Sequence, residues 1–162
     1  VPEANRARVG RRVGRAELPG AVATGLVRPR ALHIRRRGHA DDGQRGAIVN
    51  MASAAAFDGQ IGQAAYSASK GGVVGMTLPI ARDLSAVGVR VNTVAPGLID
   101  TPIYGEGEAS DAFKENLQKG VLFPKRLGDP EQLASMVVEC VTNSYMNAES
   151  IRMDGGIRMA PK

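Results

Sequence analysis

The sequence predicts an α/β fold built on a parallel sheet, and three observations support this. Two short apolar runs, Gly46–Ala52 and Val89–Ala95, have the length and composition of strands that are buried on both faces of a sheet. Gln63–Leu84, which lies between them, has apolar residues at helical spacing. A strand, a long helix and a second strand in this order form a βαβ unit, in which the two strands are parallel.

The first strand and the helix each carry features that suit a ligand site. Ser53 directly follows Gly46–Ala52, and in open parallel sheets ligands bind outside the carboxyl ends of the strands. The helix is unusually rich in alanine and glycine, so another backbone can approach it closely. Pro79 removes one helix donor and should kink the helix or mark its last turns, and Gly88 ends the pattern.

The remainder of the chain continues the alternation of strands and helices. Pro96-Gly97 closes the second strand, and a loop rich in glycine, proline and acids follows at Leu98–Glu108. Asp129 and Pro130 are residue types preferred just before a helix and at its first position. Three further elements are predicted, namely helices at Ser110–Lys119 and Pro130–Thr142 and a strand at Glu149–Met153.

Residues 1–45 differ from the rest in composition. They carry eleven arginines against four acids, a balance of +7, whereas residues 46–162 carry ten basic residues against twelve acids, a balance of −2. We therefore divide the chain into an Arg-rich segment of unassigned fold, 1–45, and a domain over 46–162. Short helices or strands are expected at most around Gly20–Val27 and Ala31–Arg37, because proline and glycine interrupt the pattern.

Three interpretations of the Arg-rich segment remain open. One is a basic arm that binds nucleic acid through phosphate contacts, but the segment has no aromatic residue to stack on a base. Another is an organelle-targeting peptide, which fits the arginines but not the absence of serine. We hypothesise the third, an out-of-frame or disordered stretch unrelated to the domain that follows.

Composition also sets limits on location and metal binding. The single cysteine, Cys140, excludes an intramolecular disulfide and indicates a reducing compartment such as the cytoplasm. No apolar run approaches the roughly 20 residues that span a bilayer, so no membrane partner is expected. Cys140 lies in the apolar run Val137–Val141 and is expected to be a core thiol. Asp100 and the acids near it are interpreted as solvated loop charges, so no metal site is predicted.

Ser53, Tyr66 and Lys70 form the candidate catalytic set. Residues four apart on a helix share one face, so Lys70 can place its ammonium beside the Tyr66 phenol. A nearby cation favours the ionised form of a phenol, which could then act as a general base. Ser53, at the strand end, can hydrogen-bond the same substrate oxygen. Tyr and Lys at this spacing occur on many surface helices, so the prediction rests on the whole set.

The whole set resembles the signature of the short-chain dehydrogenase/reductase family. That signature is a Ser, a Tyr-x-x-x-Lys about thirteen residues later, and a Pro-Gly-x-x-x-Thr after the next strand, here Ser53, Tyr66–Lys70 and Pro96–Thr101. Over FDGQIGQAAYSASKGGVVGMTLPIARDL and IRMDGGIRM the sequence is similar to the type-2 3-hydroxyacyl-CoA dehydrogenases of that family. The resemblance covers about residues 42–162. It implies the C-terminal half of a Rossmann-like, doubly wound parallel sheet.

The resemblance implies a function and a role for each site residue. The reaction would be NAD-dependent oxidation of the hydroxyl of a 3-hydroxyacyl-CoA-type substrate, or reduction of the ketone, in fatty acid metabolism. Residues 103–125 would form a substrate lid, and the helix at 63–84 would pair in a homo-oligomer. The implied site residues are Ser53, Tyr66 and Lys70 for catalysis, Ser53 and Gln60 for substrate, and Tyr66, Lys70, Pro96, Gly97, Ile99 and Thr101 for the cofactor.

The sequence departs from the family pattern in its first part. The N-terminal βαβ half would carry a Thr-Gly-x-x-x-Gly-x-Gly turn for the cofactor's pyrophosphate, and no such motif occurs here. Three hypotheses therefore stand for the function. The chain is part of an active dehydrogenase, or it is a truncated, inactive remnant or non-catalytic pairing subunit that lacks the cofactor-binding half. The third, a nucleic-acid binder acting through its Arg-rich segment, is the least expected, so nucleic acid is not the expected partner.

Overall fold

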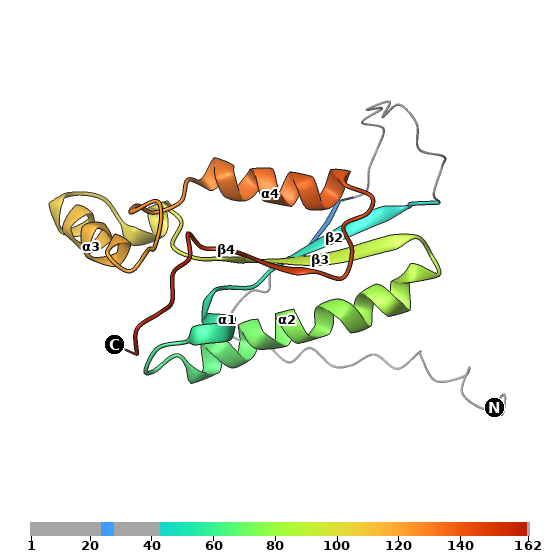
Figure 1. The fold of residues 1–162 in the computed structure, drawn as a ribbon, viewed down its shortest axis with the longest axis horizontal. Coiled ribbons are helices and arrows are strands. Elements are labelled where there is room, and N and C mark those ends of the chain that lie inside the picture. Colours follow the sequence, from blue (N-terminus) through green and yellow to red (C-terminus); the bar gives the residue numbers. More distant parts are fainter. Residues whose placement is uncertain (1–23, 28–42, 162) are drawn as a thin grey trace.

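The computed structural model describes residues 24–27 and 43–161, which form an α/β fold in three layers (Figure 1). The sheet has the strand order β1-β2-β3-β4, in which β1 pairs antiparallel with β2 and the other neighbours are parallel. Helix α4 covers one face of the sheet, and α1 and α2 cover the other (Figure 1). The elements are β1 (Thr24–Val27), β2 (Gly46–Met51), α1 (Ala55–Asp58), α2 (Ala64–Ser85), β3 (Val89–Pro96), η1 (Pro102–Tyr104), α3 (Glu108–Gln118), α4 (Pro130–Thr142) and β4 (Ser150–Met153).

The two apolar runs form the centre of the sheet, as the sequence predicts. β2 and β3 pair in parallel register from Gly46 opposite Val89 to Met51 opposite Val94. Alternate side chains point to opposite faces of a strand. Val94 packs with α4 on one face, and Ala95 packs with α2 on the other. The parallel sheet of an α/β fold is therefore confirmed.

Helix α2 is held to β3 by a buried polar contact. The hydroxyl oxygens of Thr77 and Thr93 lie 2.6 Å apart, and Thr77 also donates to the carbonyl of Val73 at 3.0 Å. Because the single Thr77 proton is used on Val73, Thr93 is the donor of the shorter contact. Pro79 lies inside the helix, which continues to Ser85, so this proline falls in the last turns.

Helix α4 ends on a buried arginine of β3. The guanidinium of Arg90 donates to the carbonyls of Cys140, Val141 and Met146 at 2.7, 2.8 and 2.5 Å. The last carbonyls of a helix lack partners within it and carry partial negative charge, so the buried guanidinium both binds them and is itself compensated. Cys140 is fully buried in the core, as predicted.

Two elements were not predicted as such, α1 and the short helix η1, which lies in the predicted loop Leu98–Glu108. The four-residue helix α1 replaces a segment interpreted only as small residues after a strand. β1 falls within the predicted piece Gly20–Val27, whereas Ala31–Arg37 and most of the Arg-rich segment lie outside the described residues. Helix α3 begins at Glu108 rather than Ser110. Among the residues described, no helix has the length and hydropathy to cross a membrane.

Candidate active site

Ser53 lies at the carboxyl end of β2, where the chain turns into α1. Its Oγ accepts a hydrogen bond from the amide of Ala55 at 3.1 Å. The amide of Ala54 is bound by the carbonyl of Pro96 at 2.8 Å, which joins this turn to the end of β3. These contacts hold the carboxyl ends of β2 and β3 together, at the end of the sheet that lies nearest α3 (Figure 1).

Tyr66 and Lys70 occupy the start of α2 and lie on one face of it. The Lys70 Nζ is 5.9 Å from the centroid of the Tyr66 ring. The same Nζ donates to the carbonyl of Met51 at 3.1 Å, which ties α2 to the end of β2. The Tyr66 side chain is 47 % exposed, so it is open to a ligand.

A cavity of about 240 Å³ brings most of the predicted site residues together. It lies over the carboxyl ends of β2 and β3, where a parallel sheet binds its ligands. Lys70 does not line it; its ammonium lies beside the Tyr66 ring and binds the carbonyl of Met51. The lining residues are Ala52, Ser53, Tyr66, Pro96, Gly97, Ile99, Thr101, Ile103, Tyr104 and Leu133.

Gln60 is directed away from this cavity. Its side-chain Nε2 donates to the carbonyl of Ala160 at 3.0 Å, and its backbone N–H donates to Oε1 of Gln63 at 3.0 Å. Gln60 is therefore the one predicted substrate-binding residue that the structure does not bring to the cavity. Its role toward substrate stays a prediction.

Tyr104 is a cavity residue that the sequence analysis did not single out. It belongs to η1, at the start of the predicted lid over residues 103–125. Its ring contacts the ring of Phe113 with centroids 6.2 Å apart and the planes tilted by 55°. An ion pair of 2.9 Å between Lys114 and Asp100 joins α3, the helix that carries Phe113, to the loop that follows β3. Asp100, interpreted from sequence as a solvated charge, thus has a partner. No sequence motif marks Tyr104.

Burial raises the pKa of Tyr104 above its ordinary value of 10.0, and the nearby negative charge of Asp100 raises it further. The cation of Lys114 acts in the opposite direction, and Tyr66 adds a smaller upward effect. Ionising Tyr104 would place a negative charge in a partly buried position near an acid. Tyr104 is therefore held in its protonated form.

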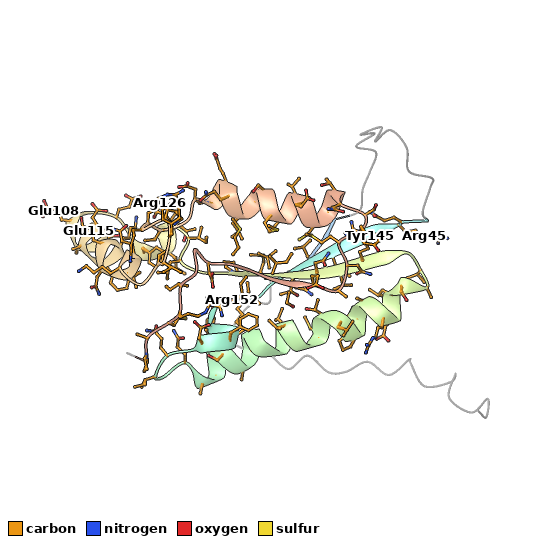
Figure 2. The ribbon with its side chains drawn as sticks, in the orientation of Figure 1. Arg45, Glu108, Glu115, Arg126, Tyr145 and Arg152 are labelled. Atoms are coloured by element: carbon orange, nitrogen blue, oxygen red, sulfur yellow. The ribbon has the colours of Figure 1, made fainter. Side chains whose placement is uncertain are left out.

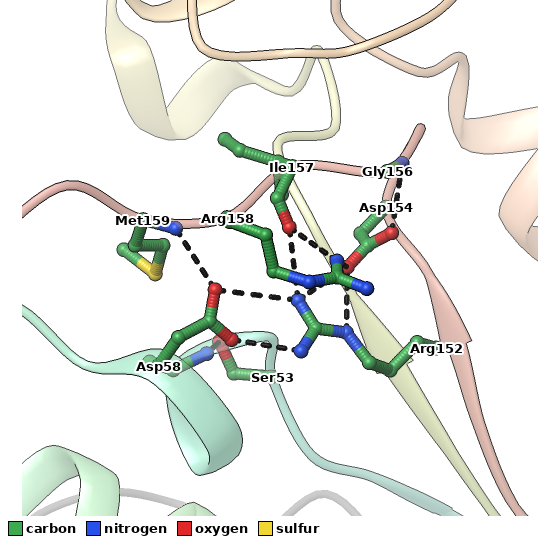
Figure 3. A network of polar contacts seen from close by, with 9 residues as sticks. Ser53, Asp58, Arg152, Asp154, Gly156, Ile157, Arg158 and Met159 are labelled. Atoms are coloured by element: carbon green, nitrogen blue, oxygen red, sulfur yellow. Dashed lines mark hydrogen bonds and ion pairs between the residues drawn. The ribbon is translucent and has the colours of Figure 1, made fainter.

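A polar network behind the cavity joins two segments that are distant in sequence, α1 and residues 152–159 (Figure 3). Arg152 of β4 lies between the sheet and α1 (Figure 2). Its guanidinium forms ion pairs with Asp58 at 2.8 Å and Asp154 at 2.6 Å and donates to the carbonyl of Ile157 at 3.0 Å. Asp58 also accepts from the amide of Met159 at 2.8 Å. Arg152 thus connects the segment between Ser53 and Tyr66 to the C-terminal residues.

Asp154 of this network also packs against Gly97, which lines the cavity. A Cβ at Gly97 would lie 2.6 Å from the Cβ of Asp154 and 2.7 Å from its Cα. The amide of Gly97 donates to the carbonyl of Met153 at 3.0 Å. Only glycine permits this close approach, so the position of Asp154 helps to fix the Pro96-Gly97 turn.

The charged members of this network stabilise one another. Burial alone would raise the pKa of Asp58, but the Met159 amide and the Arg152 guanidinium outweigh it and hold that pKa below its ordinary value of 3.8. Burial likewise opposes the charge of Arg152, while its hydrogen bonds to Asp58 and Asp154 raise its pKa. In the part of the chain that is described, no group of three or more His, Cys, Asp or Glu residues could hold a metal ion.

Comparison with known proteins finds relatives that are named as dehydrogenases and reductases. A family model described as enoyl-(acyl carrier protein) reductase matches residues 29–158. The 3-hydroxyacyl-CoA dehydrogenase type-2 of Bos taurus is 58 % identical over 119 residues, which cover 74 % of this chain and 45 % of that protein. The protein of the same name from Drosophila melanogaster is 57 % identical over 120 residues, covering 74 % of this chain and 46 % of it.

A solved structure agrees with these relatives. The crystal structure of 3-hydroxyacyl-CoA dehydrogenase type-2 from Mycobacterium avium matches with a TM-score of 0.69 and 45 % identity, covering 77 % of this chain and 47 % of that one. The chain thus spans a little under half the length of these relatives. Their likeness in sequence and in fold, together with the match to the family model over most of the chain, shows that the chain belongs to the short-chain dehydrogenase/reductase family, a family of oxidoreductases.

Proposed function

We propose that this chain carries the catalytic part of an NAD-dependent dehydrogenase that oxidises the hydroxyl of a 3-hydroxyacyl-CoA-type thioester, or reduces the corresponding ketone. One observation carries the proposal. Ser53, Tyr66 and the Pro96–Thr101 loop line one cavity, with the Lys70 ammonium beside the Tyr66 ring. The names of the relatives support the substrate class. The prediction of a cytoplasmic location accompanies this proposal.

The side chains divide the work of alcohol oxidation between them. Ser53 donates a hydrogen bond to the substrate oxygen and fixes its position. Tyr66, in its ionised form, accepts the proton of the substrate hydroxyl as the carbon gives up its hydride. Lys70 places a positive charge next to the ring, which complements the negative charge that Tyr66 carries before the transfer. In the reverse direction Tyr66 returns the proton to the ketone oxygen.

The described residues fit the nicotinamide end of the cofactor. When bound, the nicotinamide ring supplies the hydride acceptor. The cavity offers the hydroxyl of Thr101 and the carbonyl of Gly97 as polar partners, and Ile99 as an apolar surface for a ring. The sequence holds no Thr-Gly-x-x-x-Gly-x-Gly turn, so no site of that type for the pyrophosphate is proposed on this chain.

A cofactor titration of the full chain tests this proposal. NADH should bind saturably, with enhanced fluorescence and a raised melting temperature, and NADPH titrated in parallel shows which nucleotide is preferred. Tyr66→Phe should retain NADH binding and lose oxidation of 3-hydroxybutyryl-CoA by at least about a hundredfold, because it cannot take the proton.

Tyr145→Phe is the matched control, since this phenol is 98 % exposed and lies at the opposite end of the molecule from α3 (Figure 2). It should leave NADH binding and turnover unchanged. A chain that neither binds NADH nor gains stability from it would overturn the proposal and favour the inactive remnant or pairing subunit.

We further propose that α2 pairs with the same helix of a second copy of this chain. Small side chains and one proline recur on it at intervals of three and four residues and are exposed, namely Ala65, Ala68, Gly72, Gly75 and Pro79. A Cβ at Gly72 or Gly75 would meet no atom of the described residues within 4 Å. Such a surface lets two helices approach closely and bury apolar area against each other.

The oligomeric state in solution tests the pairing. Light scattering should report a dimer or larger assembly for the wild type, and Gly72→Leu should shift it to the monomer because the added side chain holds the helices apart. Glu115→Leu adds an exposed leucine on α3 and should leave the assembly intact. A monomeric wild type, or an assembly that Gly72→Leu does not change, would show that α2 is not the interface.

A further inference from the structure

Tyr104 supplies a second phenol to the cavity that contains Tyr66, and nothing in the proposed proton transfer uses it. Its hydroxyl makes no hydrogen bond to any of the described residues, although its ring is fixed by Phe113. Tyr104 is partly buried and lines the cavity, so this unused donor is available to a ligand there.

We propose that Tyr104 is a substrate-binding residue that donates a hydrogen bond to the thioester carbonyl oxygen of a 3-oxygenated acyl substrate. This inference rests on the proposed function and adds a specificity element to the same site. Ser53 and Tyr66 bind the oxygen on the third carbon, and Tyr104 binds the oxygen on the first.

The chemistry of the cavity favours a carbonyl as the partner of Tyr104. The cavity lining also includes Ile99, Ile103 and Leu133, which suit an acyl chain and offer no side-chain hydrogen bond. A carbonyl is an acceptor only, so its partner has to keep a proton. A second oxygen of the substrate would be stranded among these apolar side chains if Tyr104 did not donate to it.

The two phenols are placed in opposite electrostatic surroundings. Lys70 lies beside Tyr66 and suits a group that carries negative charge during its work. Asp100 lies near Tyr104, and burial together with this acid raises the pKa of Tyr104, so its proton stays in place. Tyr66 can therefore exchange a proton with the substrate while Tyr104 serves as a permanent donor.

The loop around Tyr104 is fastened on several sides. Ser110 donates from its Oγ to the carbonyl of Gly105 at 3.1 Å, and Lys114 binds Asp100 at 2.9 Å. With the Phe113 ring contact, these interactions hold η1 and the loop before it against α3. A fixed donor loses little conformational entropy when a ligand binds, which favours its use in recognition.

A comparison of two ligands on two variants tests the assignment by binding alone. The ligands are the N-acetylcysteamine thioester of 3-hydroxybutyrate and its thioether analogue, in which a methylene replaces the carbonyl. Dissociation constants are measured on the full chain by NMR chemical-shift titration. Tyr104→Phe should weaken thioester binding about fivefold, the worth of one neutral hydrogen bond, and change thioether binding less than about twofold.

Tyr104→Phe keeps the ring contact with Phe113, so its fold is preserved and its spectrum can be checked against the wild type. Tyr145→Phe, the same change at an exposed phenol, should alter neither ligand's affinity. An equal loss for both ligands, or no loss for the thioester, would overturn the role of Tyr104.

Failure of the proposed function gives a different result. Butyryl N-acetylcysteamine thioester, which lacks the hydroxyl, is titrated against wild type and Tyr66→Phe. If Tyr66→Phe selectively weakens the hydroxylated thioester while Tyr104→Phe has no effect, the proposed function stands and the assignment of Tyr104 is wrong. If the wild type binds none of the ligands, the proposed function and the Tyr104 assignment are both wrong.

Discussion

Arg152 and Asp58, ninety-four residues apart, form a two-pronged ion pair behind the candidate active site (Figure 3). Nη1 of Arg152 lies 2.8 Å from Oδ1 of Asp58, and Nη2 donates to Oδ2 at 3.4 Å. Both side chains are 21 % exposed, so the pair is shielded from water more than a surface salt bridge. It links β4 to the segment that connects Ser53 with Tyr66.

Arg152→Gln should lower the free energy of unfolding by about 2 kcal/mol, because it removes the guanidinium that pairs with both Asp58 and Asp154. Urea unfolding followed by circular dichroism measures this change. Arg158→Gln is the matched control. Arg158 is 66 % exposed and contacts Asp154 only at 3.5 Å, so its loss should cost less than about 0.5 kcal/mol. Equal effects of the two variants would contradict the central place of Arg152.

Acid should weaken the fold through Asp58. Its pKa is held below the ordinary 3.8 in the folded state, so the carboxylate contributes stability that is fully present above that value and is lost as pH falls below it. Unfolding free energies measured between about pH 5 and 2 should therefore fall less steeply for Asp58→Asn than for the wild type. In the Arg152→Gln background, Asp58→Asn should change this pH dependence less. An unchanged effect would show that Arg152 does not stabilise the Asp58 carboxylate.

Gly97→Ala should destabilise the fold by about 1–3 kcal/mol, because its Cβ would fall 2.6 Å from the Cβ of Asp154. The turn that lines the cavity would shift with it, so NADH affinity should fall as well. Gly71→Ala, on α2 but outside the proposed pairing surface, is the comparison, since its Cβ would come no closer than 3.8 Å to the described residues and alanine favours a helix. Thermal unfolding should show opposite signs for the two substitutions, and a stable Gly97→Ala would refute the close approach.

Alkali should weaken the fold through Tyr104. A phenol whose folded pKa is raised contributes stability that is fully present below the ordinary value of 10.0 and is lost as pH rises through the folded value. Melting temperatures measured from neutral pH to about pH 11 should fall less for Tyr104→Phe than for the wild type. Tyr145→Phe should follow the wild type, and an identical decline in all three proteins would contradict the shift.

The central elements could be predicted because their signals are local. β2 and β3 are apolar runs. Helix α4 has Asp129 at its N-cap and Pro130 at its first position, and both residue types favour the start of a helix. The amide of Asp129 is bound by the side chain of Gln132 at 3.0 Å, a contact between residues three apart. Helix α1 was missed because Ala55–Asp58 is too short to show a period and has no side-chain cap.

The candidate site was predictable where spacing alone defines it. Ser53 and Tyr66 line the same cavity, and the spacing of Tyr66 and Lys70 already places them on one helix face. The orientations of the Gln60 and Arg152 side chains could not be predicted from the sequence. Each depends on a residue from a distant segment, Ala160 for Gln60 and Asp58 for Arg152. The catalytic and binding roles of Ser53, Gln60, Tyr66 and Lys70 stay predictions.

The contacts between the loop before Tyr66 and the C-terminal residues have a consequence for the order of folding. The amide of Met159 binds Asp58 across 101 residues, and the carbonyl of Ala160 binds Gln60 across 100. Contacts of such high sequence separation form late and slow the search for the native state. During synthesis Ser53 and Tyr66 leave the ribosome about a hundred residues before the segment that braces them, so the catalytic geometry is completed only after translation has reached the final strand and its tail.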